Sequence, residues 1–493
     1  MRKGLSFVML LAFLLAFSSS SATKIIGYFI SWGVYARDYH VPDIPATKIT
    51  HINYAFANIS SDGKIMLGDS YADIDKYYPG DSWDPESLRG NFHQLIKLKE
   101  RYPHIKTLIS VGGWTWSWRF PSVAATESAR QKFAKSCAEF VIKYKFDGVD
   151  IDWEYPTAAD KHNFTLLLAA LRQKLDSIGT IYGRHYLLTI AAPAGPHNIA
   201  NIEVDSIVRY LDWINLMTYD YHGPWSGPAD AVTNLNAPLY PSSRDPLGEP
   251  YHSLYNQSAT VDTYIALGVP PQKLVLGLPF YGRGYGNVST TGGINGLFAS
   301  YSGRASVGTW EAGVFDFYDL YHNYVDTNGY TRYWEDDAKV PWLFNPTARI
   351  MISYDDTQSI GEKVRFAIAE SLGGVMFWEF SCDRDEMLID KIYDILVTSV
   401  GEELTLSTMH SKLTISVAPN PFNGYLKITL PEIHGDNWFV EIYSLAGKRV
   451  WGPRLSNGNV LIWHPEDNIA SGVYVIRAFT DKLNATARVV YLK

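Results

Sequence analysis

Apolar and polar positions along most of the chain follow two alternating periods. Short apolar runs rich in β-branched and aromatic residues are typical of buried strands, and the runs between them have the apolar spacing of amphipathic helices. Strand and helix alternate eight times, which predicts an α/β fold, the (β/α)8 TIM barrel, over residues 23–400. The predicted strands are 24–30, 51–57, 106–111, 148–153, 186–192, 213–218, 274–278 and 374–380, and the predicted helices are 91–101, 128–144, 159–178, 202–210, 259–266, 361–371 and 385–397.

Two segments interrupt this rhythm. The polar stretch 60–87 is predicted to be a long loop. About ninety residues separate the seventh and eighth strands, far more than an ordinary connection needs. The part at about 283–354 is rich in Gly, Tyr, Phe and Trp and has short β-like runs such as 349–353. We therefore expect an α+β insertion there, beside the carboxyl ends of the strands.

The C-terminal part of the chain has a different pattern. Residues 401–412 are polar without periodicity and are predicted to be a linker. From 413 to 493 short strands and turns follow one another without a helix, which predicts an all-β sandwich domain. Its predicted strands are 413–417, 425–430, 439–443, 473–479 and 487–491.

The first 22 residues have the pattern of a signal peptide. Arg2 and Lys3 precede an apolar run over 5–17, and small residues follow at 20–22. The apolar run is short for a membrane span, so we expect export and cleavage, with an uncleaved anchor as the alternative. The mature protein is then secreted, extracellular or at the cell surface.

Composition narrows the classes of partner. The formal net charge of −8 argues against nucleic acid, and 15 Trp and 33 Tyr supply flat faces that can stack on sugar rings. Two cysteines, Cys137 and Cys382, are no disulfide framework, and we expect two separate buried thiols. We also expect a monomer.

The chemistry of the predicted barrel centres on its fourth strand, in the run Phe146–Pro156. Asp150, Asp152 and Glu154 alternate with apolar residues and would share one face of a strand. Repulsion and desolvation raise the pKa of at least one such carboxyl, which supplies a general acid near neutral pH. The alternatives are a solvated strand edge and a divalent-metal site.

Aromatic and polar residues recur where the other strands end, at the face of a barrel that carries active sites. Together they predict a sugar-binding cleft around the carboxyl groups. They are Tyr28, Trp32, Phe56, Trp114, Trp116, Met217, Tyr219, Asp220, Tyr281, Arg283 and Trp378.

The run Asp147–Glu154 resembles the DGxDxDxE signature of glycoside hydrolase family 18, the chitinases. The resemblance implies that Glu154 protonates the glycosidic oxygen and Asp152 holds the substrate's acetamido group. It also implies that Asp150 tunes Asp152 and that Asp147 supports the strand end.

Three further runs, 110–113, 217–220 and 374–379, are similar to other strand motifs of that family, so that the resemblance spans about 24–397. It implies that Tyr219 and Asp220 contact the acetamido sugar, that Trp378 lies under it, and that Gly112 and Gly113 give structural support. The remaining implied cleft residues are Tyr28, Phe56, Trp114, Met217, Tyr281 and Arg283.

The implied reaction is hydrolysis of β-1,4 bonds between N-acetylglucosamine units of chitin or its oligomers. In this family the substrate's N-acetyl oxygen is the nucleophile and no metal or organic cofactor takes part. Residue spacing alone leaves Asp152 open as the nucleophile. Two rival functions remain: an endo-β-N-acetylglucosaminidase acting on N-glycan cores, and a non-hydrolytic chitin-binding protein.

Three runs in the tail, 419–423, 440–447 and 470–474, resemble the C-terminal sorting domain of type IX secretion. The resemblance implies that secretion machinery is a partner. The alternative is a carbohydrate-binding module, for which Trp438, Trp451 and Trp463 are the available aromatic residues.

Overall fold

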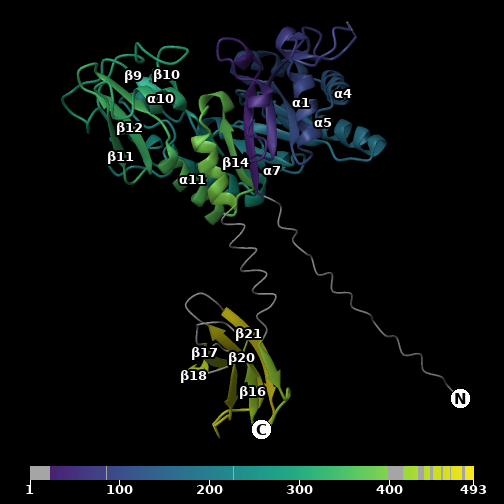
Figure 1. Cartoon of the computed structure of the whole chain (residues 1–493), viewed down its shortest axis with the longest axis vertical. Helices are drawn as coiled ribbons and strands as arrows, with labels where there is room; N and C mark the ends of the chain where they lie inside the picture. Colours follow the sequence, from purple (N-terminus) through teal and green to yellow (C-terminus); the bar gives the residue numbers. More distant parts are fainter. Residues whose placement is uncertain are drawn as a thin grey trace, which may run out of the picture. The chain divides into compact units, whose positions relative to one another are not determined.

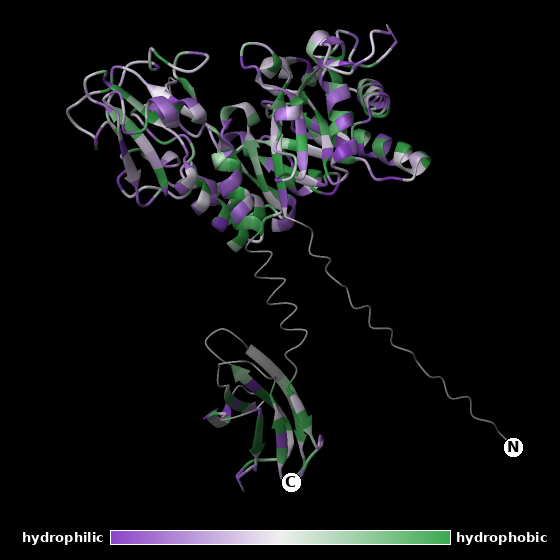
Figure 2. Cartoon of the chain, in the orientation of Figure 1, coloured by the Kyte–Doolittle hydropathy of each residue, from purple (hydrophilic) through white to green (hydrophobic). Residues whose placement is uncertain are grey.

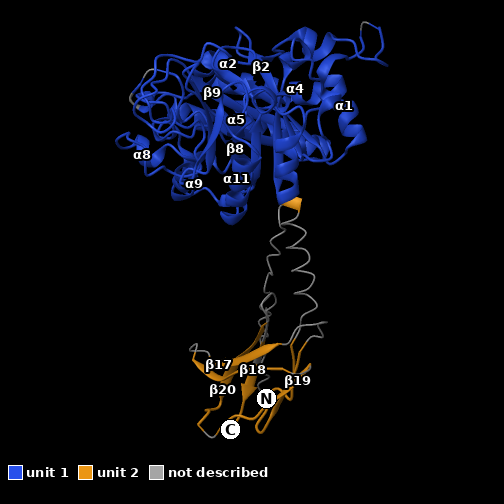
Figure 3. Cartoon of the chain, turned by 60° about the vertical axis from the view of Figure 1, so that its left-hand side comes forward, with its two compact units in different colours: residues 1–395 blue, residues 396–493 orange. Residues whose placement is uncertain are grey.

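The computed structural model describes residues 23–84, 86–225, 227–397 and 415–493, apart from 431–437, 445–447, 457–458, 467 and 480–483. The chain forms two compact units, residues 1–395 and 396–493 (Figure 3). The predicted signal peptide (1–22) and linker (401–412) lie outside the described residues. Within the described ranges, no helix combines the length and the apolar character that crossing a bilayer requires.

The first unit is a closed parallel barrel, which confirms the predicted fold class. Strand β1 pairs with β14 on one side and with β2 on the other, so the sheet has no free edge (Figure 1). The order around the ring is β1-β14-β8-β7-β6-β5-β4-β2. The strands are β1 (Lys24–Ile30), β2 (His51–Ile59), β4 (Lys106–Gly112), β5 (Gly148–Asp152), β6 (Leu187–Ala192), β7 (Trp213–Leu216), β8 (Leu274–Pro279) and β14 (Gly374–Trp378).

Helices surround the barrel, and their two-sided hydropathy contrasts with the apolar strands (Figure 2). Helix α4 begins where the Thr126 side chain accepts a hydrogen bond from the Ala129 N–H, and α5 ends at Gly183 with a φ of 66°. The longer helices are α1 (Gly90–Arg101), α4 (Glu127–Tyr144), α5 (Lys161–Tyr182), α9 (Gln257–Ala266), α11 (Thr357–Ala369) and residues 387–397. Short helices are α2 (Gly113–Trp116), α3 (Phe120–Ala124), α6 (Pro196–Ile199), α7 (Val204–Ile207) and α8 (Tyr251–Leu254).

The expected loop 60–87 has structure of its own. It contains the short strand β3 (Ile65–Met66), antiparallel to β2, and one helical turn at Tyr71–Asp75. The buried Asp73 carboxylate accepts hydrogen bonds from the Gly68 and Asp69 N–H groups, which closes this segment on itself.

The connection between β8 and β14 carries the expected α+β insertion. Its antiparallel sheet has the order β10-β9-β13-β12-β11, with α10 (Phe317–Asn323) beside it. Leu235, from the β7–β8 connection, packs into the core of this insertion, so the barrel and the insertion share apolar contacts. The strands are β9 (Tyr281–Tyr285), β10 (Val314–Asp316), β11 (Thr331–Glu335), β12 (Val340–Asn345) and β13 (Ile350–Ser353).

The second unit has two antiparallel sheets, β15-β16-β19 and β18-β17-β20-β21. Trp438 and Trp463 lie in its apolar core and Trp451 packs against that core. The planar row of exposed aromatics that a carbohydrate-binding module needs is therefore not formed by these three residues. The strands are β15 (Ser416–Ala418), β16 (Leu426–Thr429), β17 (Phe439–Ser444), β18 (Arg449–Leu455), β19 (Val460–Trp463), β20 (Gly472–Phe479) and β21 (Asn484–Tyr491).

Cys137 and Cys382 are both free and buried, which confirms the expectation of two separate thiols.

Candidate active site

A cleft of about 1000 Å³ opens at the carboxyl ends of the barrel strands and extends to the insertion. Parallel strands bring their carboxyl ends to one face, so residues far apart in the sequence meet there. Twelve residues singled out from the sequence as catalytic, supporting or substrate-binding line the cleft: Tyr28, Phe56, Gly112, Trp114, Asp152, Glu154, Met217, Tyr219, Asp220, Tyr281, Arg283 and Trp378.

Asp150 lies beneath the cleft, fully buried at the centre of the barrel. One carboxylate oxygen accepts hydrogen bonds from Tyr28 at 2.8 Å and Ser110 at 2.8 Å, and the other from Thr189 at 2.6 Å and Asn215 at 3.2 Å. Burial raises the pKa of this carboxyl and the four hydrogen bonds oppose that rise. Because donors on four other strands engage its two oxygens, the Asp150 carboxyl is held in one fixed position.

Asp152 is the next acid along β5 and lines the cleft floor with 3% of its surface exposed. Burial, then the neighbouring Glu154 and Asp150, raise the pKa of Asp152 well above its ordinary value. Its Oδ1 atom is buried and has no hydrogen-bond partner within the described structure. A buried carboxyl oxygen without a partner is costly, so this atom is suited to a polar group of a ligand.

Glu154 lies two residues beyond the end of β5, in the cleft wall. Burial and the Asp220 carboxylate raise the pKa of Glu154 to about 7, against hydrogen bonds from Tyr155 and the Trp114 backbone. The Ser117 hydroxyl accepts a hydrogen bond from the Glu154 N–H at 2.8 Å, which fixes the backbone here. The segment after β5 therefore presents a carboxyl group whose pKa of about 7 leaves it partly protonated near neutral pH.

The turn after β4 brings its backbone against these acids. Gly112 has a φ of 109°, and a Cβ there would lie 2.3 Å from the Asp152 backbone oxygen. Gly113 has a φ of 71°, and a Cβ there would lie 2.6 Å from the Phe56 ring. Both the positive φ and the close approach require glycine, which is a physical reason for the Gly-Gly pair.

Aromatic rings form the cleft floor at the end of β14. Trp378 stacks on Phe56 with ring centroids 5.7 Å apart and also contacts Tyr28 at 5.4 Å and Trp32 at 6.4 Å. Trp114 is 76% exposed at the rim. Large flat rings that line one cleft suit the apolar faces of sugar rings.

A charged pair borders the other wall of the cleft. Asp220 accepts two hydrogen bonds from the Arg283 guanidinium, at 2.8 and 2.7 Å. The Arg283 guanidinium also lies over the Tyr281 ring at 5.0 Å and the Trp225 ring at 5.5 Å. Tyr219 packs its ring edge against Tyr281, with centroids 6.1 Å apart. Arg283 thus holds Asp220 in place, and the Asp220 carboxylate contributes to the raised pKa of Glu154.

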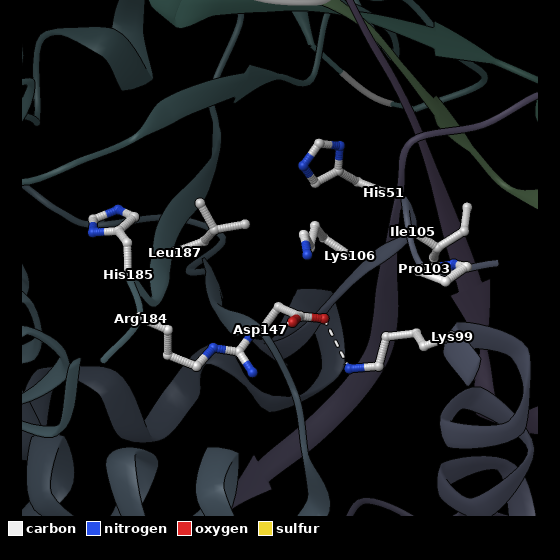
Figure 4. A pocket seen from close by; sticks show the side chains of 9 residues that line it. All are labelled: His51, Lys99, Pro103, Ile105, Lys106, Asp147, Arg184, His185 and Leu187. Atoms are coloured by element: carbon white, nitrogen blue, oxygen red, sulfur yellow. Dashed lines mark hydrogen bonds and ion pairs between the residues drawn. The ribbon is translucent and has the colours of Figure 1, made fainter. Parts of the chain in front are cut away.

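Asp147 does not reach the cleft. It precedes β5 and lines a separate hollow at the amino ends of the strands (Figure 4). Its carboxylate accepts hydrogen bonds from Lys99 at 2.8 Å and the Thr107 N–H at 2.8 Å, and it pairs with Arg184.

Sequence reasoning missed several residues of the cleft. Arg37 from the segment after β1 pairs with Asp316 of the insertion at 2.6 Å and lies 3.6 Å from Glu379. Glu379 directly follows Trp378 and lies in the run 374–379, which resembles a family motif, and this was a usable signal. No local sequence pattern marked Asp316, because its contact with Arg37 joins residues 279 positions apart. The other missed lining residues include Tyr155, Trp225, Glu311 and Cys382.

A parallel barrel whose central acids face an aromatic trough is the construction of carbohydrate-cleaving enzymes. Comparison with models of known protein families assigns the chain to such a class of enzymes. The chain belongs to the glycosyl hydrolases family 18, whose model matches residues 24–383. A second model, the secretion system C-terminal sorting domain, matches residues 416–492.

Individual proteins of known name match the chain as well. Chitinase A1 of Niallia circulans is 45% identical over 415 residues, which cover 76% of this chain and 58% of that protein. Chitinase 1 of Aphanocladium album is 40% identical over 362 residues, covering 72% of this chain and 81% of that protein. The structure of chitinase ChiA74 from Bacillus thuringiensis superposes with a TM-score of 0.70 at 33% identity, covering 95% of this chain and 85% of that one.

Proposed function

We propose that the enzyme is a chitinase that hydrolyses β-1,4 bonds between N-acetylglucosamine units. The observation that carries the proposal is the Oδ1 atom of Asp152. This atom is buried next to the proposed acid Glu154 and has no hydrogen-bond partner among the described residues. The N–H of a 2-acetamido group is a donor that would satisfy this oxygen. The names of the relatives, which are chitinases, support the same substrate class.

In this proposal Glu154 is the general acid. Its pKa of about 7 leaves a large protonated fraction at neutral pH, so a proton is available for the departing glycosidic oxygen. Once that proton has left, the Glu154 carboxylate takes one from the attacking water. One residue thus acts as acid and then as base.

The nucleophile in this proposal is the substrate's own acetamido oxygen. Burial and two neighbouring acids raise the Asp152 pKa, which favours a neutral carboxyl, and a neutral carboxyl is a poor nucleophile. Asp152 would instead orient the acetamido group by accepting a hydrogen bond from its N–H at Oδ1. Tyr219, which also lines the cleft, would assist Asp152 in this role.

The first test compares the Glu154→Gln variant with the unchanged enzyme on N-acetylglucosamine oligomers and polymeric chitin, with products separated by chromatography. The rate should fall by about 10³-fold or more while chitin binding persists. Near-normal turnover would contradict the role of Glu154. If the unchanged enzyme binds chitin without product release, it is a binding protein, and release from high-mannose glycopeptides alone would indicate an N-glycan endoglycosidase.

A second test addresses the nucleophile. Fully deacetylated chitosan lacks the acetamido oxygen and should not be cleaved. Rapid cleavage of chitosan would favour Asp152 as the nucleophile.

We further propose that the C-terminal unit directs the enzyme through type IX secretion machinery to the cell surface or the medium. The match of residues 416–492 to a sorting domain supports this role. Deletion of 416–492 should leave the enzyme active but retained in the cell. Residues 409–493 alone should not bind chitin in a pull-down, whereas binding would restore the carbohydrate-binding alternative.

A further inference from the structure

The barrel has a second hollow, at the end opposite to the cleft. Its volume is about 780 Å³, and its residues precede or begin strands β2, β4, β5 and β6 (Figure 4). The proposed hydrolysis uses none of them as a group that touches substrate. The lining residues are His51, Lys99, Pro103, Ile105, Lys106, Asp147, Arg184, His185 and Leu187.

The hollow has an excess of positive charge. Three cationic residues, Lys99, Lys106 and Arg184, line it together with one carboxylate, that of Asp147. Lys99 and Arg184 both pair with it, and in Figure 4 they lie on its two sides. Lys106 is exposed and, among the described residues, has no carboxylate within salt-bridge distance. In a chain of net charge −8, such a concentration of cations is suited to an anion.

Asp212, a further carboxylate next to this hollow, is already engaged by other groups. The carboxylate of Asp212 pairs with His185 at 2.6 Å and Arg172 at 3.3 Å, and accepts the Leu188 N–H at 2.7 Å. Burial lowers the pKa of Lys99, so its ammonium ion would gain from a further negative neighbour.

His51 adds a hydrogen-bond acceptor to the hollow. When the Thr50 hydroxyl donates to the Ile25 carbonyl at 3.0 Å, the His51 Nδ1–H donates to that hydroxyl at 2.7 Å, and Nδ1 carries the ring proton. Burial, helped by Lys24 and Lys106, lowers the pKa of His51 to about 3, which keeps the ring neutral. Its Nε2 atom is then a bare acceptor beside a group of cations.

We propose that this hollow binds a phosphate-type oxyanion, either inorganic phosphate or a phosphate monoester. Lys106, with the free N–H groups of Lys99 and Arg184, would bind the charged oxygens through charge-assisted hydrogen bonds. A protonated phosphate oxygen would donate to His51 Nε2. The bound ion would join α1, the start of β5 and the α5–β6 turn, at the base of the strand that carries the acids.

The test uses the full chain and radiolabelled inorganic phosphate in equilibrium dialysis, at ionic strength held constant with chloride. One phosphate should bind per chain, in a saturable way. The Lys106→Met variant should bind about tenfold more weakly, because it removes one charge-assisted contact. The Lys135→Met variant, which removes a lysine from the exposed face of α4, is the matched control and should bind as the unchanged protein does.

Chitin hydrolysis reports folding in these variants, since neither lysine lies in the cleft, and both should retain full activity. Sulfate, which has no proton to give to His51, should compete several-fold less well than phosphate. The absence of saturable binding, or equal binding by the Lys106→Met and control variants, would overturn the site. Equal competition by sulfate would overturn the His51 contact.

Discussion

Replacement of Glu154 by Gln should make the barrel more stable at alkaline pH while it abolishes hydrolysis. The folded protein raises the pKa of Glu154 from 4.5 to about 7, so it binds a proton more tightly than the unfolded chain does. Glu154 therefore lowers the free energy of unfolding progressively as pH rises from about 4.5 to about 7, and this loss of stability is complete above that range. A neutral Gln of similar shape does not incur that loss.

The size of the gain follows from the same shift. One pKa unit corresponds to about 1.4 kcal/mol, so a rise from 4.5 to about 7 corresponds to about 3 kcal/mol above pH 7. An unfolding entropy of about 2 cal/mol/K per residue, over roughly 370 residues, converts this into a melting temperature higher by about 4 °C. Below pH 4.5 the variant and the unchanged protein should melt together.

Differential scanning calorimetry at about pH 5 and pH 8 measures the effect, on the transition of the barrel unit. The matched control is Glu100→Gln, the same substitution at an exposed position of α1, and it should show no pH-dependent gain. The reasoning is refuted if Glu154→Gln melts no higher than the unchanged protein at pH 8. A gain of equal size at both pH values would also refute it.

Four further predictions concern the same barrel. The kcat/KM of hydrolysis should fall tenfold per pH unit above about 7 as Glu154 loses its proton, and a flat alkaline limb would contradict this. Gly112→Ala should destabilise the barrel by several kcal/mol more than Gly183→Ala. Both glycines have a positive φ, but only a Cβ at Gly112 would collide with backbone atoms. Equal melting temperatures of the two variants would refute the contact. Asp147→Asn should lower the free energy of unfolding by about 2–3 kcal/mol at neutral pH, because it leaves two cations unpaired. Since those cations lower the pKa of Asp147, the deficit should vanish in acid. A pH-independent deficit in denaturant titrations would contradict the pairing. Trp114→Ala should leave the melting temperature unchanged but slow hydrolysis of polymeric chitin several-fold, and a changed melting temperature would show that the ring is part of the core.

The barrel was predictable because its signal is local. Each strand is a short apolar run and each helix has its own spacing, so that element type did not depend on distant contacts. The acidic strand was predicted to include Trp153, whereas β5 ends at Asp152 and Glu154 lies beyond the sheet. That difference of one residue reflects the Glu154 N–H, which bonds Ser117 instead of a neighbouring strand.

The tail shows where local patterns fail. Strand β18 contains Gly452 and Pro453, which usually interrupt strands, and it was not predicted. Strand β19 is a continuous apolar run of four residues with Val460 and Ile462 exposed, so alternation gave no signal. In the cleft, the Arg37–Asp316 pair depends on the placement of the insertion, which no local pattern encodes.

The four donors to Asp150 bear on how such an enzyme could be transferred to another scaffold. An eight-residue acidic run grafted onto a foreign barrel would carry the carboxyl groups but not Tyr28, Ser110, Thr189 and Asn215. These donors lie on four strands spread across the chain, and only Ser110 falls within a run that resembles a motif of the family. The acidic motif therefore depends on the closed ring of strands around it. A minimal design must copy one position from each of four strands together with the motif.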